Sequence, residues 1–185
     1  MRFFFVRHSE SLWNVKNLCQ GQKDIALSPK GLEEAKMFAA KLAHRPIGYI
    51  CTSPLQRALK TAEMIKEYHP QAGFCLIEEF SERCWGPLEG EPAEKVYEFE
   101  RQERICEDFK ISPLMESRQD FKSRIKKGLE KAFQLHDEPL IVSHGRLFSD
   151  LCELLDLPSI RQIKNLGFME ITKTSRGWEL KELEL

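Results

Sequence analysis

Residues 3–14 read FFFVRHSESLWN, and this stretch decides the fold. Its first four residues, Phe3 to Val6, form a continuous apolar run that is typical of a strand buried on both faces. The run stops at the polar residues Arg7 to Ser11, which is too soon for a signal peptide or a membrane-spanning helix. A buried strand followed at once by polar side chains is typical of α/β proteins, whose ligand sites lie at the carboxyl ends of strands.

Short apolar runs recur along the chain and alternate with segments that have apolar residues at helical spacing. Further strands are predicted at Ile47–Cys51, Phe74–Ile77 and Pro139–Ser143. Helices are predicted at Pro29–Ala43, Ala93–Glu107 and Ser117–Leu135, after Ser53-Pro54, and around Leu147, Leu151, Leu154 and Leu155. Both Ser28-Pro29 and Ser53-Pro54 combine a capping serine with a first-turn proline, which predicts that a helix starts at each of them.

The tail changes period. Phe168–Lys173 and Trp178–Leu185 alternate apolar and polar residues, as edge strands joined by a turn at Ser175-Arg176-Gly177 would. The alternation of strands and helices before this tail predicts an α/β fold, a three-layer α/β/α sandwich with a mostly parallel sheet. We expect one domain over residues 1–185, with a small helical cap inserted at about residues 91–116.

Composition excludes several classes of protein. Of the 185 residues, 42% are apolar and 31% are charged, which fits a folded globular chain rather than a disordered or membrane protein. The 28 basic and 29 acidic residues give a net charge of −1, so we expect no nucleic-acid and no membrane partner. The six cysteines form no CxxC pair, which predicts reduced thiols in the cytoplasm, without disulfides or a metal site. The sequence gives no indication of the oligomeric state.

Polar side chains follow the predicted parallel strands. They lie in the segments Arg7–Ser11, Ser53–Arg57, Glu79–Arg83 and Ser143–Gly145. Each segment alone has an ordinary explanation, such as a helix cap, a surface ion pair or a solvated loop charge. Because the carboxyl ends of parallel strands meet at one edge of a sheet, we expect these segments to converge. Histidines, arginines and a glutamate gathered there suit a phosphoryl group, since guanidinium groups bind phosphate oxygens in bidentate fashion.

The order and spacing of these residues resemble the phosphoglycerate mutase-like branch of the histidine phosphatase superfamily. The matching elements are the opening Arg7-His8-Ser9-Glu10-Ser11-Leu12-Trp13-Asn14; the set Gly21, Asp24, Leu27, Ser28 and Gly31; the segment Thr52–Ala58 with Thr61-Ala62; the set Glu82, Gly86, Glu89 and Gly90; Glu116-Ser117; and Val142–Gly145. The resemblance implies the phosphoglycerate mutase-like α/β fold and chemistry on a small phosphorylated metabolite.

The resemblance also implies roles for five catalytic residues. His8 would attack phosphorus and form a phosphohistidine, while Arg7, Arg57 and His144 hold the transferring oxygens. Glu82 would protonate the leaving alcohol and then take a proton from the attacking water, which requires a raised pKa. The positive side chains would stabilise the charge that Mg²⁺ stabilises in other phosphotransferases, so no metal and no other cofactor is expected.

The phosphate-binding residues implied by the resemblance are less well defined. Asn14, with backbone N–H groups near Gln20 and Gly21, would complete a phosphate cradle, and Gly145 adjoins the second histidine. Ser9 stands where the family usually has glycine, so its side chain strains the backbone, narrows the pocket or hydrogen-bonds phosphate. Arg146 follows Gly145 and either reads a second anionic group in the site or lies on the surface at a helix start.

Three other functions are alternatives to a histidine phosphatase. Cys51-x5-Arg57 formally matches a thiolate phosphatase, but its intervening residues include no glycine, and Pro54 has no amide hydrogen. A phosphoglycerate mutase-type phosphotransferase needs extra arginines in the cap, where Arg101 and Arg104 are interleaved with glutamates, so hydrolysis is favoured. A non-catalytic module that binds a phosphorylated ligand is disfavoured because every expected catalytic residue is present.

Overall fold

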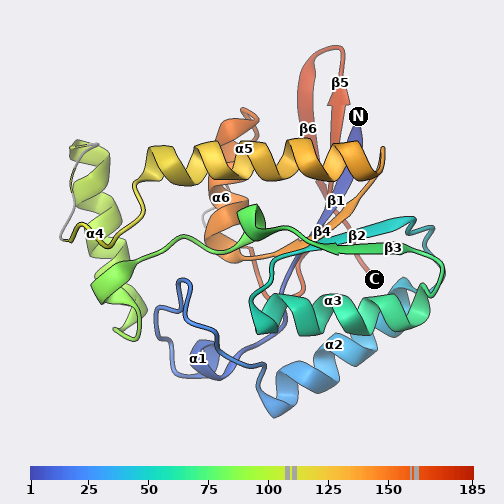
Figure 1. Ribbon diagram of the computed structural model, residues 1–185, viewed down its shortest axis with the longest axis horizontal. Coiled ribbons are helices and arrows are strands. Elements are labelled where there is room, and N and C mark those ends of the chain that lie inside the picture. The colour runs from blue at the N-terminus through green and yellow to red at the C-terminus, as the bar shows by residue number, and fades with distance from the viewer. Residues whose placement is uncertain (107–108, 110–111, 159, 161–162) are drawn as a thin grey trace.

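The computed structural model describes residues 1–106, 109, 112–158, 160 and 163–185 (Figure 1). In this part of the chain six strands form one sheet in the order β3-β2-β4-β1-β5-β6. Their bounds are β1 (Arg2–Arg7), β2 (Tyr49–Thr52), β3 (Gly73–Leu76), β4 (Leu140–Ser143), β5 (Phe168–Thr174) and β6 (Gly177–Glu182). Strands β1 to β4 are parallel, and the antiparallel hairpin β5–β6 pairs with β1. The predicted α/β fold with a mostly parallel sheet is confirmed.

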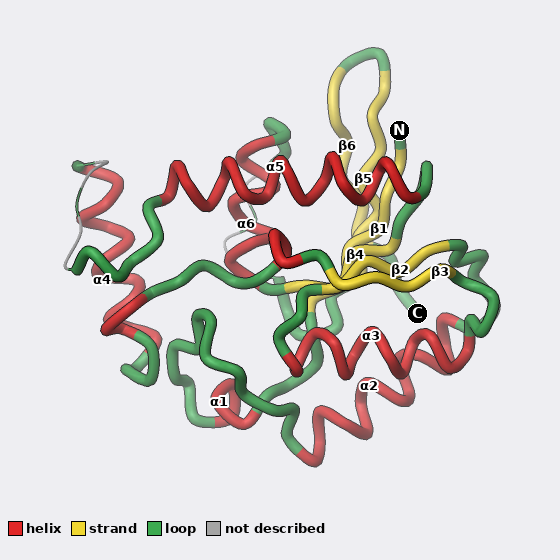
Figure 2. Tube along the Cα trace, viewed as in Figure 1, coloured by secondary structure: helices red, strands yellow, loops and turns green. Residues whose placement is uncertain are grey.

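The first strand explains why both faces of the sheet are covered. Phe3 and Phe5 are fully buried in the core that β1 shares with α5 (Arg118–Leu135) and α6 (Gly145–Leu154). Val6 lies in the other core, with side chains of α2 (Pro29–Leu42) and α3 (Gln56–Tyr68). Figure 2 shows the two helix pairs on opposite sides of the strands. Because successive side chains of a strand point to opposite faces, the apolar run contributes to both cores, and the three-layer arrangement is confirmed.

A separate group of helical elements lies away from the middle of the sheet. It comprises α1 (Leu12–Val15), the 3₁₀ turn η2 (Gly86–Leu88) and α4 (Ala93–Ile105), whereas the 3₁₀ turn η1 (Glu78–Phe80) packs against α5. Figure 1 shows α4 set apart from the sheet, beyond one end of α5. A third apolar cluster holds α4 in place, and it consists of Cys19, Trp85, Leu88, Val96, Phe99 and Met115. The helix predicted to reach Glu107 ends at Ile105, and residues 107, 108, 110 and 111 of the expected cap lie outside the described residues.

Several predicted boundaries shift by one to three residues. Strand β3 is Gly73–Leu76 rather than 74–77, because its register with β2 ends at the pair Thr52–Leu76 and the chain then turns into η1. Strand β2 likewise begins at Tyr49 and not at Ile47. Only β6 of the two tail strands lies at the edge, because β5 pairs with β1 as well as with β6.

The predicted start of the second long helix at Ser53-Pro54 is wrong. Helix α3 begins at Gln56, and Leu55 occupies the cap position without a side-chain capping bond. The Gln56 N–H donates instead to the Asp24 carboxylate at 2.7 Å, so a distant side chain takes the capping role. The Ser53 hydroxyl accepts the Leu55 N–H and lies 2.8 Å from the His144 ring, so this serine belongs to the site rather than to the helix.

Gly128, in the middle of α5, allows η1 to approach the helix closely. A Cβ atom at this position would lie 2.7 Å from Cε1 of the buried Phe80 and 3.0 Å from Cβ of Glu79. Replacing glycine by alanine in a helix normally stabilises it by about 1 kcal/mol. We predict the opposite for Gly128→Ala, a loss of about 1–2 kcal/mol in the free energy of unfolding, because overpacking a core outweighs that gain.

Urea denaturation measures this effect. Lys126→Ala, at an exposed position of the same helix, is the control and should change stability by less than about 0.5 kcal/mol. A Gly128→Ala protein as stable as the unchanged chain would contradict the predicted close contact.

Candidate active site

The polar residues at the strand ends surround one cavity of about 170 Å³. Strand β1 ends at this cavity, and its register with β4 places Arg7 beside Ser143. The residues that follow these two, His8 and His144, therefore lie next to each other, with ring centroids 5.2 Å apart. The backbone fixes this arrangement further, because the His8 N–H donates to the Ser143 carbonyl at 2.9 Å.

His8 is buried and its ring is held in one orientation. Its Nδ1 lies 2.7 Å from the Ser9 carbonyl oxygen. Since a carbonyl oxygen only accepts, Nδ1 carries the hydrogen and Nε2 keeps its lone pair. Burial, and then the charges of Arg57 and Arg7, hold the pKa of His8 well below its ordinary value. A neutral imidazole with a free Nε2 lone pair is suited to nucleophilic attack.

Two arginines act on this histidine, the buried Arg57 and the partly buried Arg7. Arg57 is fully buried, and it donates to the carbonyls of Lys23 at 2.8 Å and Gly21 at 2.7 Å. Arg7 donates to the carbonyl of Ile163 at 2.6 Å. Burial lowers the pKa of Arg57 to about 10 and also lowers that of Arg7, so both remain cations at neutral pH.

His144 lies next to His8 and is fully buried. Its Nε2 lies 2.8 Å from the Ser53 hydroxyl, and burial holds its pKa well below the ordinary value. Among the described residues, its Nδ1 has no hydrogen-bond partner, and the same holds for the Nε atoms of Arg7 and Arg57. A buried polar group without a partner is costly, so three such nitrogen atoms around one histidine indicate a site for an oxyanion.

Glu82 also lines the cavity. Its carboxylate accepts three backbone N–H groups, from Arg83 at 2.9 Å, Arg146 at 3.0 Å and Leu147 at 3.1 Å. The last two belong to the first turn of α6, a position that favours an anion. Burial nevertheless raises the pKa of Glu82, against the effect of these N–H groups and of Arg57. A raised pKa suits a carboxyl group that gives and takes a proton near neutrality.

The remaining cradle residues that the sequence suggested all line the cavity. Asn14 belongs to the capping box of α1, where its Oδ1 accepts the Ser11 N–H, and the Gln20 side chain lies 2.7 Å from the Ser11 hydroxyl. Gly21 has φ of +50°, and a Cβ there would lie 2.1 Å from a Glu89 carboxylate oxygen, so only glycine fits. Gly145 begins α6 and lets the Arg7 guanidinium approach its Cα closely.

The two departures from the family pattern have different outcomes. The Ser9 hydroxyl donates to the Gly31 carbonyl at 2.8 Å, and Ser9 does not line the cavity. Its backbone does not adopt the left-handed conformation, so serine introduces no strain there. Arg146 does line the cavity, and its guanidinium pairs with Glu100 of α4 and with Asp150 of α6.

Cys51, the alternative nucleophile, is far less suited to attack. It is fully buried in β2 and does not line the cavity. A hydrogen bond with Cys75, at 3.7 Å between sulfur atoms, and burial raise the pKa of its thiol. A protonated, buried thiol is the inert state of cysteine.

Sequence reasoning missed two contributors to the site. The sequence pattern at Ser53-Pro54 predicts a helix cap. Ser53 also follows the end of a predicted strand, and this position is the signal that indicates a site residue. Asn165 donates to the His8 carbonyl at 2.8 Å and lies 3.4 Å from Asn14 Oδ1, although it is far from both in sequence. No local pattern around Asn165 predicts this position.

Comparison with known proteins agrees with the geometry. The family model described as histidine phosphatase superfamily (branch 1) matches residues 3–185. "Uncharacterized phosphatase PhoE" of Bacillus subtilis (strain 168) is 32% identical over 187 residues, covering 97% of this chain and 92% of that protein. "Probable phosphoglycerate mutase GpmB" of Yersinia pestis (strain Pestoides F) is 30% identical over 200 residues, covering 98% and 91% respectively.

The fold agrees as well. The crystal structure of phosphoglycerate mutase from Bacillus anthracis superposes with a TM-score of 0.81 at 21% identity, covering 99% of this chain and 92% of that one. The chain therefore shares the fold of that structure and carries a buried histidine pair at the carboxyl edge of its sheet. This chain belongs to the histidine phosphatase superfamily, branch 1.

The two buried histidines make the fold sensitive to acid. Below about pH 6.5 the unfolded chain binds protons that folded His8 and His144 do not bind, so stability is lost as the pH falls. Each unmatched proton contributes a slope of up to about 1.4 kcal/mol per pH unit. We predict that His8→Asn makes the loss of unfolding free energy between pH 7 and pH 5.5 shallower.

Urea denaturation at a series of pH values measures the slope. His44→Asn is the matched control, because the side chain of His44 is exposed in the folded protein. Equal slopes for the His8 variant and the unchanged protein would show that His8 is not held neutral by the fold.

Proposed function

We propose that this chain is a phosphomonoester hydrolase that acts through a phosphohistidine on a small phosphorylated metabolite, without a metal or other cofactor. The proposal is carried by one observation: beside His8, the residues Arg7, Arg57 and His144 each have a buried nitrogen atom without a hydrogen-bond partner among the described residues. The oxygens of a phosphoryl group would accept hydrogen bonds from all three.

In the first step His8 Nε2 forms a bond to phosphorus as the bond from phosphorus to the leaving oxygen breaks. Glu82, in its protonated form, gives its proton to that leaving oxygen, so an alcohol departs. Arg7 and Arg57 stabilise the charge on the non-bridging oxygens, the part that metal ions play in other phosphotransferases. With the Ser53 hydroxyl donating to its Nε2, neutral His144 carries its hydrogen on Nδ1 and donates it to the same group.

In the second step a water molecule attacks the phosphohistidine and the bond between phosphorus and nitrogen breaks. The Glu82 carboxylate, now ionised, takes a proton from that water and returns to its starting form. His8 is regenerated as the neutral imidazole and inorganic phosphate leaves. The raised pKa of Glu82 supports both roles, because the carboxyl group must donate and accept within one cycle.

A phosphoglycerate mutase-type phosphotransferase is the second candidate, and relatives that bear this name support it. The first step would be the same, with a second hydroxyl in place of water afterwards. Glu100 of α4, which lines the cavity, favours hydrolysis, because its carboxylate disfavours an anionic acceptor beside the phosphoryl site. A non-catalytic module that binds a phosphorylated ligand is the third candidate.

We also propose a cytoplasmic location. The six cysteines are all free thiols, as in a reducing compartment. Among the described residues, none of the helices has the length and apolar character needed to span a membrane. The same residues contain no cluster of three or more potential metal ligands.

Trapping of the intermediate tests the main proposal. After incubation with a ³²P-labelled aryl phosphate in the presence of EDTA, we predict a protein-bound phosphate that is stable in base and lost in acid. His8→Ala should abolish both this adduct and turnover, whereas His44→Asn should keep both. The measurement is scintillation counting of protein quenched in base and in acid.

Other outcomes would favour the alternatives. An adduct that survives His8→Ala and is lost in Cys51→Ser would identify a thiolate phosphatase. Isomerisation of phosphoglycerate faster than its hydrolysis would identify a mutase. Phosphate-ester binding without an adduct or turnover would leave the binding module.

Glu82→Gln should separate the two steps. An alkyl phosphate needs protonation of its leaving oxygen, so we predict a kcat about 10²–10⁴-fold lower and no burst. 4-Nitrophenolate leaves without a proton, so its first turnover should slow by less than about tenfold. A burst of about one 4-nitrophenol per site should then precede slow hydrolysis of the phosphohistidine. Stopped-flow absorbance measures the burst.

Glu78→Gln, an exposed residue of the same segment, is the control and should behave like the unchanged protein. An equal loss of the first turnover for both substrates would argue against Glu82 as the general acid.

A further inference from the structure

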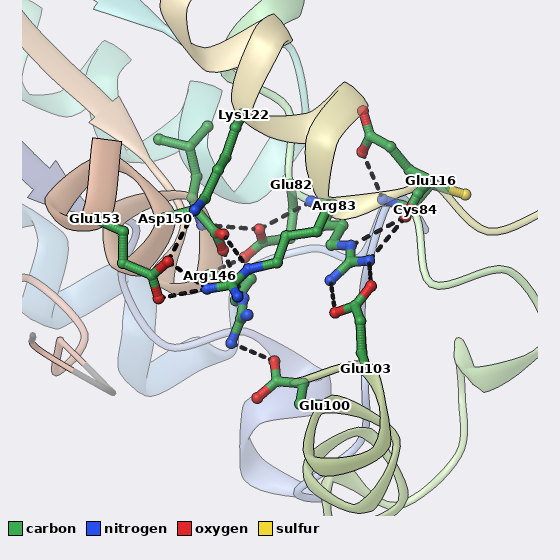
Figure 3. A network of polar contacts seen from close by, with 12 residues as sticks. Glu82, Arg83, Cys84, Glu100, Glu103, Glu116, Lys122, Arg146, Asp150 and Glu153 are labelled. Carbon is green, nitrogen blue, oxygen red and sulfur yellow. Dashed lines mark hydrogen bonds and ion pairs between the residues drawn. The ribbon is translucent and has the colours of Figure 1, made fainter. Parts of the chain in front are cut away.

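Two arginines near Glu82 are neutralised by glutamates of α4 (Figure 3). Glu103 pairs with Arg83 through both oxygens, and both side chains are buried. Glu100 pairs with Arg146, and each of these side chains is only 14% exposed. Arg83, which follows Glu82, and Arg146, which follows Gly145, are thus each paired with a glutamate of α4.

Arg146 is the one of these two arginines that lines the cavity. Its Nε lies 2.7 Å from Asp150, which is fully buried and also accepts from Arg118 at 3.1 Å. The Glu100 carboxylate contacts the far end of the guanidinium, at Nη1. Arg146 is therefore engaged at Nε and Nη1, and a further anion at its guanidinium would lie close to the Glu100 carboxylate and compete with it.

The cavity lining offers few other charges to a second anion. Among the described residues, its charged side chains are Arg7, Arg57, Glu82, Glu100 and Arg146. Arg7 and Arg57 act on His8, where the proposed phosphoryl group binds. Much of the remaining lining is apolar or aromatic and includes Trp13, Leu18, Trp85, Val96 and Tyr97. Beyond the phosphoryl site, the cation of the described lining is therefore Arg146, which Glu100 neutralises.

We infer that Glu100 is a specificity-determining residue that closes the cavity to a second anionic group. The substrates are then phosphomonoesters of uncharged alcohols. Esters whose alcohol carries a carboxylate or another phosphate are rejected, because such a group would face the Glu100 carboxylate and compete with it for Arg146. This inference rests on the proposed function, since it concerns the leaving group of that reaction.

A matched pair of esters tests it, phenyl phosphate and 4-carboxyphenyl phosphate, which differ by one carboxylate. For the unchanged protein we expect kcat/KM to be at least about tenfold higher for phenyl phosphate. Glu100→Gln keeps the shape of the side chain and frees Arg146 for a substrate carboxylate. It should shrink the preference about tenfold, mainly through a lower KM for the carboxylated ester.

Two further variants locate the effect. Glu98→Gln makes the same charge change at an exposed position of α4 that does not line the cavity, and should change the preference by less than about twofold. Adding Arg146→Gln to Glu100→Gln should abolish the gain for the carboxylated ester. The backbone N–H of residue 146 that Glu82 accepts remains present in that double variant.

Equal kcat/KM values for the two esters in the unchanged protein, or an equal change for both in Glu100→Gln, would overturn the inference. If neither ester is hydrolysed, the proposed function fails, and calorimetry with phenylphosphonate and 4-carboxyphenylphosphonate decides the selectivity separately. Tighter binding of the uncharged phosphonate, with the difference reduced in Glu100→Gln, would support the role of Glu100. Equal affinities would overturn it.

Discussion

The parallel pairing of β1 with β4 is the constraint on which the site depends. It sets Arg7 opposite Ser143, so the residues that follow, His8 and His144, emerge side by side. The same strand end also positions Glu82. The Ser143 hydroxyl donates to the Phe80 carbonyl at 2.7 Å, two residues before Glu82. A shift of one residue in this register would turn the side chains of the shifted strand to the other face of the sheet and separate the two histidines.

Burial then determines the charge of each group that the register brings together. Two histidines and two arginines that lie this close together would repel each other if all were charged. Instead burial and the guanidinium charges keep His8 and His144 neutral, while Arg7 and Arg57 give up some basicity and stay cationic. The result is a neutral histidine pair beside the fixed positive charges of Arg7 and Arg57.

The sequence predicted the layers because local patterns encode them, and it predicted half of the cavity lining from the strand ends and from the family resemblance. The run Phe3–Val6 specifies a strand with two buried faces, and His8 and His144 follow strand ends directly. The failures have physical causes. Ser53-Pro54 has the composition of a helix start, yet Asp24 supplies the cap from a separate loop. Asn165 reaches the His8 carbonyl only through tertiary folding, which no local pattern records.

The way in which Glu82 is held has a consequence for how such a site can diverge. Its carboxylate is bound by main-chain N–H groups of residues 83, 146 and 147, none of which depends on the identity of a side chain. The side chains of Arg83 and Arg146 point away toward α4 and carry the contacts to Glu103 and Glu100 (Figure 3). Substitutions of these two side chains can therefore change the contacts to α4 while the Glu82 carboxylate stays where it is, so that, under the proposed function, selectivity and chemistry are free to evolve independently.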